Sequence, residues 1–287
     1  MKKLCTFLLL SLLSVVSAFA GTELRVMTYN MRLEIAVDGE HQWKYRKDFA
    51  ADLVRFHQPD IWGSQEVTHP QLVDLLDRLP EYDYIGVGRD DGKEKGEYSP
   101  IFYRKDRFEL EKSGYFWLAE EAKMHVPGAL GWDADYPRVA TWGIFKDKVS
   151  GERFFMLNTH LDHVGVEARR NGAKLVLSEV SRLSENLPVI VTGDFNAVPT
   201  DEPIRILTDK SNKNAFTHTR DVADFCYGPD WTFHAYGTID YDQRTFIDYV
   251  FFKGNFKVKT HAVITDTKGK AYPSDHCPVL AVVELEK

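Results

Sequence analysis

The chain is 287 residues long, carries 36 basic and 43 acidic side chains, and has a formal charge of −7 at pH 7. A chain of this length can bury an adequate hydrophobic core without disulfide bonds. Its acidity disfavours tight, non-specific binding to nucleic acid, which draws its affinity from neutralised phosphates, although a local basic groove can lie on an acidic protein.

The first twenty residues have the features of an export signal. Lys2 and Lys3 give a positive start, residues 4–16 are apolar, and Ala-Phe-Ala at 18–20 fits a cleavage site before Gly21. The apolar run is short for a bilayer span, so a cleaved signal is favoured over an uncleaved membrane anchor. We therefore expect a periplasmic or extracellular protein with no stable membrane insertion.

The mature chain, residues 21–287, is expected to form one domain and to be a monomer. It has no second long apolar run, no low-complexity tract and no internal repeat. Without the two lysines of the leader, 34 basic residues stand against 43 acidic ones, a formal charge of −9. Two cysteines remain, Cys226 and Cys277, and both a disulfide bridge and two buried thiols are open interpretations.

In the first half of the mature chain, apolar runs alternate with helical patterns, and polar residues follow where the runs end. The predicted elements are a strand over residues 24–27, a helix over 49–56, a strand over 61–62 and a helix over 68–79. The first strand leads to Asn30 and the second to Glu66. Pro59 ends the first helix, and Thr68 is placed to cap the second.

The second half repeats this arrangement. Its predicted elements are strands over residues 154–157, 189–192, 246–252 and 279–285 and a helix over 176–183. The polar residues at the strand ends are His160, Asp194, Asn196, Asp248, Asp275 and His276. The alternation indicates an α/β class with helices packed outside sheets, and periodicity leaves open whether there are one or two sheets.

Each of these polar residues alone is typical of a cap or a solvated loop. Together their chemical types fit the cleavage of a phosphate ester. This reaction needs a hard cation, which takes oxygen ligands such as the Glu66 carboxylate and the Asn30 amide. It also needs an acceptor that holds the attacking water and donors to the phosphate oxygens. The side chains that can fill these roles are Asp194, Asn196, His160 and His276.

Six short motifs carry a resemblance to a known family. They are Thr28-Tyr29-Asn30, Gln65-Glu66, Thr159-His160-Leu161, Gly193-Asp194-Phe195-Asn196, Ile247-Asp248-Tyr249 and Ser274-Asp275-His276. In this order they resemble the endonuclease/exonuclease/phosphatase superfamily, which includes deoxyribonuclease I-like nucleases and Ccr4-like deadenylases. The resemblance implies a four-layered α/β/β/α sandwich of two packed mixed sheets, flanked by helices, with the site at one rim.

The resemblance also implies a metal site. Asn30 and Glu66 would hold the ion, with Asp275 near it. Magnesium is the expected ion, and manganese or calcium are alternatives. These three residues are the predicted metal ligands.

The same resemblance assigns the catalytic roles. Asp194 would orient or deprotonate the water, Asn196 and His160 would contact the phosphate, and Asp248 would orient His276. The general base is left with Asp194 and His276 as a pair.

A seventh segment, residues 96–103, resembles the part of the deoxyribonuclease branch that carries a glutamate partner for the first catalytic histidine. Glu97 is therefore a predicted partner of His160, and a solvated loop glutamate is the alternative.

Residues between the motifs are candidates for substrate recognition. Arg32, Arg46, Arg138 and Arg169 have guanidinium groups that match phosphate oxygens, and we expect about half of them to reach the site. Trp43 and Trp132 lie in hydrophilic surroundings, where either stacking on a substrate or packing at the rim is open. His163 has no role in the family pattern and is not predicted to belong to the site.

These features favour an exported hydrolase of a small or glycan-borne phosphate. A secreted nuclease is the first alternative and predicts a basic, aromatic-bearing stripe that the sequence does not show. A phospholipid phosphodiesterase is the second, and no exposed apolar hairpin supports it. An inactive binding protein on the same scaffold is the third, and the complete catalytic set argues against it.

Overall fold

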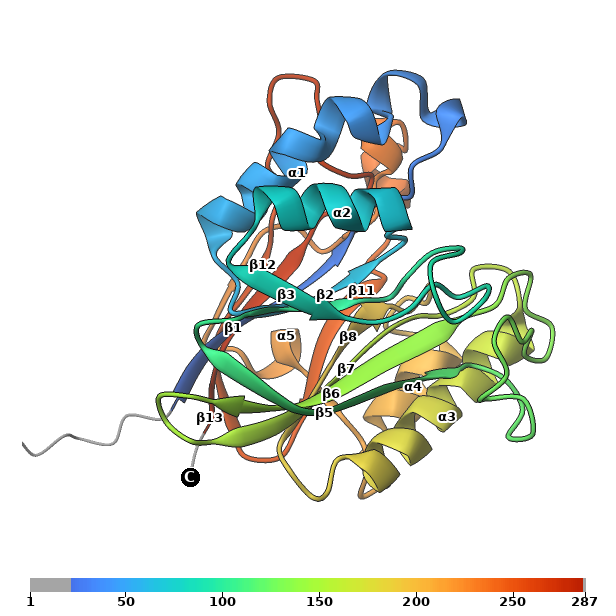
Figure 1. Ribbon diagram of the computed structural model, residues 1–287, viewed down its shortest axis with the longest axis vertical. Helices are drawn as coiled ribbons and strands as arrows, with labels where there is room; N and C mark the ends of the chain where they lie inside the picture. The colour runs from blue at the N-terminus through green and yellow to red at the C-terminus, as the bar shows by residue number, and fades with distance from the viewer. Residues whose placement is uncertain (1–21, 286–287) are drawn as a thin grey trace, which may run out of the picture.

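The computed structural model describes residues 22–285, and the predicted signal segment lies outside the described residues. Two mixed β-sheets pack face to face, with helices on both outer surfaces (Figure 1). The prediction of a four-layered α/β/β/α sandwich is therefore confirmed. Within residues 22–285, no helix combines the length and apolarity needed to cross a bilayer.

The first sheet has seven strands. In spatial order they are β10 (Phe225–Tyr227), β12 (Phe256–Val263), β13 (Val279–Leu285), β1 (Thr22–Asn30), β2 (Ile61–Gln65), β4 (Ile101–Arg104) and β3 (Tyr82–Ile85). Helices α1 (Trp43–His57) and α2 (His69–Arg78) cover its outer face, at the top of Figure 1.

The second sheet has six strands. In spatial order they are β5 (Phe108–Trp117), β6 (Val139–Asp147), β7 (Arg153–His160), β8 (Val189–Asp194), β11 (Asp248–Lys253) and β9 (Thr217–His218). Helices α3 (Val166–Leu183) and α4 (Glu202–Thr208) cover its outer face (Figure 1). The short elements α5 (Thr219–Val222), η1 (Ala36–His41), η2 (Ala235–Gly237) and η3 (Tyr241–Gln243) lie in connections.

The ends of the first two helices follow local sequence signals. Helix α1 stops at Gln58, which takes the left-handed conformation (φ 47°) directly before Pro59. Helix α2 begins after Thr68, whose backbone N–H donates to Gln71 Oε1 (3.0 Å) in a capping box. Pro70 lies in its first turn, where a missing N–H costs nothing.

A polar cluster lies between the sheets, surrounded by apolar core. Asn158 on β7 donates through Nδ2 to the carbonyls of Ser64 (2.7 Å) and Pro100 (3.0 Å). Its Oδ1 accepts from Gln65 Nε2 (2.7 Å) and Thr192 Oγ1 (3.0 Å). Because Asn158 is fully buried and its polar atoms are paired, it fixes β2 against β7 and β8.

Strand pairing brings the polar strand ends together. Parallel β1 and β2 place Asn30 opposite Gln65, next to Glu66. Parallel β7 and β8 place His160 opposite Asp194. Antiparallel β11 begins at Asp248, opposite Asp194. The carboxyl ends of four strands and the start of a fifth therefore meet at one edge of the sandwich.

The two cysteines of the mature chain are unpaired. Cys226 is exposed on β10 and Cys277 is buried after β12. Of the two interpretations left open by the sequence, free thiols are correct, although only one of them is buried.

Candidate active site

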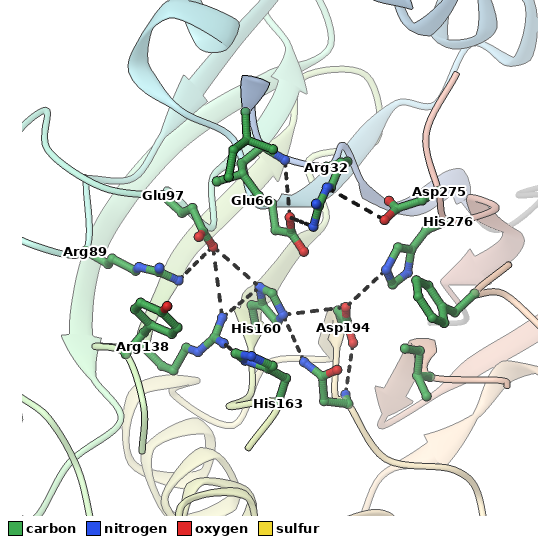
Figure 2. A pocket seen from close by; sticks show the side chains of 16 residues that line it. Arg32, Glu66, Arg89, Glu97, Arg138, His160, His163, Asp194, Asp275 and His276 are labelled. Atoms are coloured by element: carbon green, nitrogen blue, oxygen red, sulfur yellow. Dashed lines mark hydrogen bonds and ion pairs between the residues drawn. The ribbon is translucent and has the colours of Figure 1, made fainter. Parts of the chain in front are cut away.

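A pocket of about 410 Å³ opens at the edge where the strand ends meet (Figure 2). One group of its lining side chains is ionisable and nearly all buried. We call them the pocket floor: Glu66, His160, Asp194, Asp275 and His276. Four motifs that are scattered over the chain therefore meet in the floor of one pocket.

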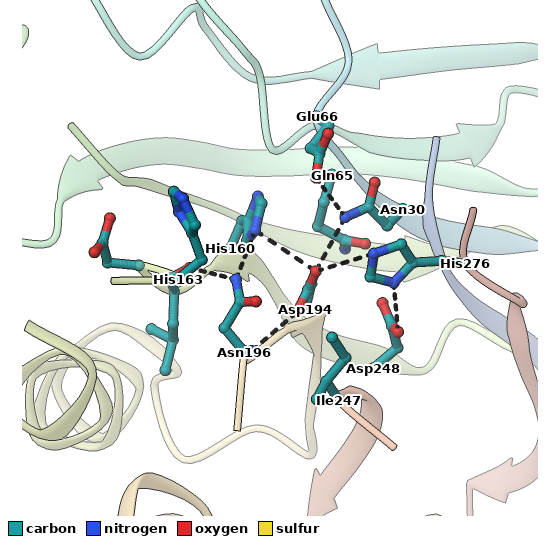
Figure 3. A network of polar contacts seen from close by, with 12 residues as sticks. Asn30, Gln65, Glu66, His160, His163, Asp194, Asn196, Ile247, Asp248 and His276 are labelled. Carbon is teal, nitrogen blue, oxygen red and sulfur yellow. Dashed lines mark hydrogen bonds and ion pairs between the residues drawn. The ribbon is translucent and has the colours of Figure 1, made fainter. Parts of the chain in front are cut away.

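Asn30 bridges two carboxylates of the floor. Its Nδ2 donates to Glu66 Oε1 (3.0 Å) and to Asp194 Oδ2 (3.0 Å), as Figure 3 shows. Its Oδ1 accepts from the backbone N–H of Arg32 (2.9 Å). Asn30 was predicted as a metal ligand through its oxygen, but in this arrangement its nitrogen faces Glu66.

Asp248, His276 and Asp194 form a chain of contacts. Asp248 Oδ2 lies 2.8 Å from His276 Nδ1, and His276 Nε2 lies 3.8 Å from Asp194 Oδ2 (Figure 3). Burial disfavours the imidazolium, but Asp248 and Asp194 outweigh it and raise the pKa of His276 to about 10. Burial, with Asp248 adding to it, raises the pKa of Asp194 to about 7. The pair can thus hold and release a proton within the pocket.

His160 has an arginine as its hydrogen-bond partner. Arg138 Nη1 lies 3.1 Å from His160 Nδ1, while Glu97 Oε2 is 4.0 Å away. The nearest partner of Glu97 is Arg89 Nη1, at 2.7 Å. Glu97 therefore lies beside His160 as predicted, and its side chain is only 13% exposed, so the alternative of a solvated loop glutamate is wrong. The nearer partner of His160 is Arg138, which was not predicted as such.

Charge and burial determine the ionisation of His160 and Glu97. Burial, helped by Arg138 and Arg89, lowers the pKa of His160 well below its ordinary value, so the imidazole is neutral. Burial, with Glu66 adding to it, raises the pKa of Glu97 to about 7. Asn196 Nδ2 lies 3.0 Å from His160 Nε2 and also donates to the carbonyl of Leu161. His160 and Asn196 are therefore neutral groups that line the pocket.

Two of the four candidate arginines line the pocket. Arg32 binds Asp38 (2.9 Å) and lies 3.9 Å from Glu66 and 3.8 Å from Asp275. Arg138, through Nε, also donates to Asp162 Oδ1 (3.2 Å). The expectation that about half of the four would reach the site is met.

The other candidates lie elsewhere and are corrected. Arg46 is buried and donates to backbone carbonyls, including that of Pro273 (3.2 Å), so it supports the loop that carries Asp275. Arg169 donates to the carbonyl of Asp162 (3.0 Å) and does not line the pocket.

Trp43 is 1% exposed, and its Nε1 donates to Asp74 (2.9 Å). It packs in the hydrophobic core under α1 and α2 and cannot stack on a substrate. Trp132 is half-buried and is not part of the pocket lining.

Six residues that line the pocket were not predicted: Leu33, Ile35, Arg89, Tyr136, His163 and Phe233. Nothing in their spacing marks them, because they come from loops and contact the site only through the tertiary fold.

The backbone also departs from ordinary values at the site: Arg32, Glu66 and Asn196 have φ of 52°, 61° and 45°. Such left-handed residues directly after strands turn side chains toward the pocket.

The donor set of the floor fits a hard divalent cation. Ligand atoms of Glu66, His160 and Asp194 lie within 4.8 Å of one another. A second cluster, Asp194, Asp248 and His276, fits less well because the Asp248–His276 hydrogen bond occupies it. Burial works against the Glu66 carboxylate, but His276 and Asn30 outweigh it and lower its pKa, so it is ionised. Carboxylate oxygens are what such a cation prefers.

Comparisons with known proteins agree with this geometry. A family model described as "Endonuclease/Exonuclease/phosphatase family" matches residues 27–276. An endonuclease/exonuclease/phosphatase structure from Bacteroides vulgatus is 42% identical, with a TM-score of 0.88, covering 92% of this chain and 100% of that one. The mannosyl-6-phosphatase of Bacteroides thetaiotaomicron VPI-5482 is 38% identical, with a TM-score of 0.83 and coverage of 91% and 99%.

More distant relatives include nucleic-acid enzymes. The Ccr4 3'-5'-exoribonuclease subunit of Mycosarcoma maydis is 25% identical over 200 residues, 55% of this chain and 30% of that protein. A mimivirus protein, L388, is 27% identical over 181 residues, 60% of this chain and 65% of its own. The chain thus spans less than two thirds of these curated relatives.

Proposed function

Since the chain belongs to the endonuclease/exonuclease/phosphatase family, whose members hydrolyse phosphate esters, we propose that it is a magnesium-dependent phosphatase of a sugar-borne phosphate. We propose further that it acts outside the cytoplasm, on the strength of the leader-like residues 1–20. The mannosyl-6-phosphatase, 38% identical over nearly the whole chain, supports the substrate class.

One observation carries the proposal: the pocket has a compact floor of ionisable groups, and the arginines that line the pocket are already matched with acids. Arg32 pairs with Asp38, Arg89 with Glu97, and Arg138 with Asp162. A polynucleotide needs cations that are free to neutralise successive phosphates, and these pairs do not provide them. One phosphate at the floor, by contrast, needs only local donors and a cation.

The residues of the floor and their neighbours have different roles in the proposed reaction. Glu66, with Asp275 beside it, would hold the cation, which would supply positive charge to the phosphate. Asp194 and His276 take the proton of the attacking water, and Asp248 holds His276 by its Nδ1. His160 and Asn196 contact the phosphate oxygens, and Asn30 keeps Glu66 and Asp194 at a fixed separation.

A substrate panel tests the proposal. Purified protein is given magnesium and offered mannose 6-phosphate, an activated aryl phosphate, a phosphodiester, plasmid DNA and phospholipid. We expect release of inorganic phosphate from the sugar phosphate with the highest kcat/KM. Degradation of DNA at catalytic enzyme levels without attack on the sugar phosphate would establish the nuclease alternative. Cleavage of phospholipid alone would establish the phospholipid phosphodiesterase alternative.

A further inference from the structure

The site pocket has an exposed rim that is chemically unlike its floor. Among its lining residues, Ile35, Tyr136 and His163 are exposed, and we call these three the pocket rim. None of the three is an acid, a lysine or an arginine, and none takes part in the catalytic contacts described above. A substrate whose phosphate reaches the floor must leave the rest of its body against this rim.

Tyr136 is held in place although it is exposed. The Arg89 guanidinium lies 5.0 Å from the centroid of its ring, and the His163 ring stacks on it at 5.9 Å and 16°. The tyrosine nevertheless remains 46% exposed. A side chain that is braced by two neighbours and still presents ring surface binds a partner with little further loss of rotamer freedom.

His163 has a defined donor beside this ring. Its Nδ1 lies 2.9 Å from Arg138 Nη2, and an arginine can only donate. The Nδ1 atom therefore accepts, which leaves Nε2 as the nitrogen that carries a proton. Within the part of the chain that the structure describes, this N–H has no protein partner.

We propose that Tyr136 and His163 form the subsite for the sugar ring of the substrate, an inference that rests on the proposed function. The Tyr136 ring packs against the C–H face of a pyranose, and His163 Nε2–H donates to a ring hydroxyl. Arg89 and Arg138 act through these two residues and position them. Selectivity for a cyclic over an acyclic alcohol is thus located at the rim, apart from the hydrolytic residues.

The test compares two substrates that share a phosphate monoester and differ in the alcohol: mannose 6-phosphate and glycerol 3-phosphate. The measured quantity is the ratio of their kcat/KM values in the wild type, Tyr136→Ala and Tyr136→Phe. We expect Tyr136→Ala to lower the ratio about tenfold, mainly through the KM of the sugar phosphate. Tyr136→Phe retains the ring and should retain the ratio.

Tyr45→Ala is the matched control, since Tyr45 is a 66% exposed tyrosine on α1 outside the pocket, and its ratio should equal that of the wild type. If Tyr136→Ala lowers kcat/KM for both substrates equally, Tyr136 only holds Arg89 in place. If Tyr136→Ala leaves both kcat/KM values and their ratio unchanged, the ring contributes nothing. Either result overturns the inference and leaves the proposed function standing. If the wild type releases no phosphate from any hexose phosphate, the proposed function fails, and the inference fails with it.

Discussion

The hydrogen bond between Asp248 and His276 connects the catalytic pair to the fold. Asp248 is 1% exposed at the start of β11, and only its Oδ2 has a partner, the Nδ1 of His276. Its Oδ1 is buried without a hydrogen-bond partner among the described residues. A carboxylate left half-satisfied in this way costs stability, and its retention fits a role in holding the imidazole.

We predict that Asp248→Asn lowers kcat by about 10²–10⁴-fold, because the amide cannot support a positive imidazole. The substitution preserves shape, so the melting temperature should stay close to that of the wild type. Steady-state kinetics and a thermal melt followed by circular dichroism give both quantities. A variant that melts much earlier yet turns over normally while folded would make Asp248 a structural residue instead.

Residue by residue, the sequence predicts those site members whose position follows from a strand end. Asn30, His160 and Asp194 were identified in this way, and strand pairing does bring them together. Arg46 and Trp43 were misplaced, because their partners are distant in sequence. Arg46 reaches the carbonyl of Pro273, 227 positions away, and no local pattern records that contact.

The close packing of the two sheets depends on Gly63 in β2. A Cβ on Gly63 would lie 2.2 Å from Thr192 Oγ1 and 2.3 Å from Asn158 Oδ1, so the sheets cannot keep their separation with a larger residue. We predict that Gly63→Ala lowers the free energy of unfolding by about 1–3 kcal/mol, because it overpacks the interface and disrupts the buried hydrogen bonds. Urea denaturation measures it.

Gly172→Ala in α3 is the control for this prediction. Its Cβ would come no closer than 3.3 Å, and the nearest atom is the tip of the Leu161 side chain. Because alanine favours a helix, the stability should change by no more than about 1 kcal/mol in either direction. Equal stability of the two variants would contradict the account of the sheet interface.

A buried histidine on β12 makes the fold sensitive to acid. Burial, with Arg220 adding to it, lowers the pKa of His261 to about 4, below the value of about 6.5 in an unfolded chain. Between these pH values His261 is protonated in the unfolded chain and neutral in the folded chain. The stabilisation is therefore complete above about pH 6.5 and falls as the pH is lowered to about 4, by on the order of 3 kcal/mol.

We predict that His261→Asn, which can keep a donor toward Thr219, flattens the dependence of melting temperature on pH across this window. The slope should not vanish, because burial also lowers the pKa of His218 and His234. Thermal melts of both proteins at several pH values measure the slope. Parallel curves for the wild type and the variant would refute the assignment.

At the scale of elements, the sequence predicts best where local signals and burial agree. Helix α2 was placed by Thr68, which caps it as expected. The strand pair β5 and β6 was not predicted, because much of β5 is exposed and its charged face gives no continuous apolar pattern. The number of sheets also stayed open, since it is decided by contacts such as those of Asn158 between strands distant in the chain.

For the whole molecule, the leader predicts where the protein works. We expect the mature chain to begin at Gly21 in the periplasm or medium of a cell that exports it. Mass determination of the N-terminal peptide from fractionated cells measures this directly. Recovery of the intact chain, starting at Met1, from the cytoplasm alone would contradict export and leave the proposed reaction unaffected.

The molecule as a whole is acidic, and we propose that a cation in its small pocket neutralises one phosphate. The Glu66 carboxylate is central to this proposal, since it lies within reach of both His160 and Asp194. Glu66→Gln keeps the shape of the side chain and removes its charge, which should weaken the affinity for magnesium.

The most direct measurement is the release of inorganic phosphate from mannose 6-phosphate by protein stripped with a chelator and then titrated with magnesium. We expect no release in the chelator, full recovery with magnesium, and a shift of the Glu66→Gln titration to higher magnesium concentrations. Undiminished release by the stripped, metal-free protein would contradict the central claim that the floor of this pocket works through a cation.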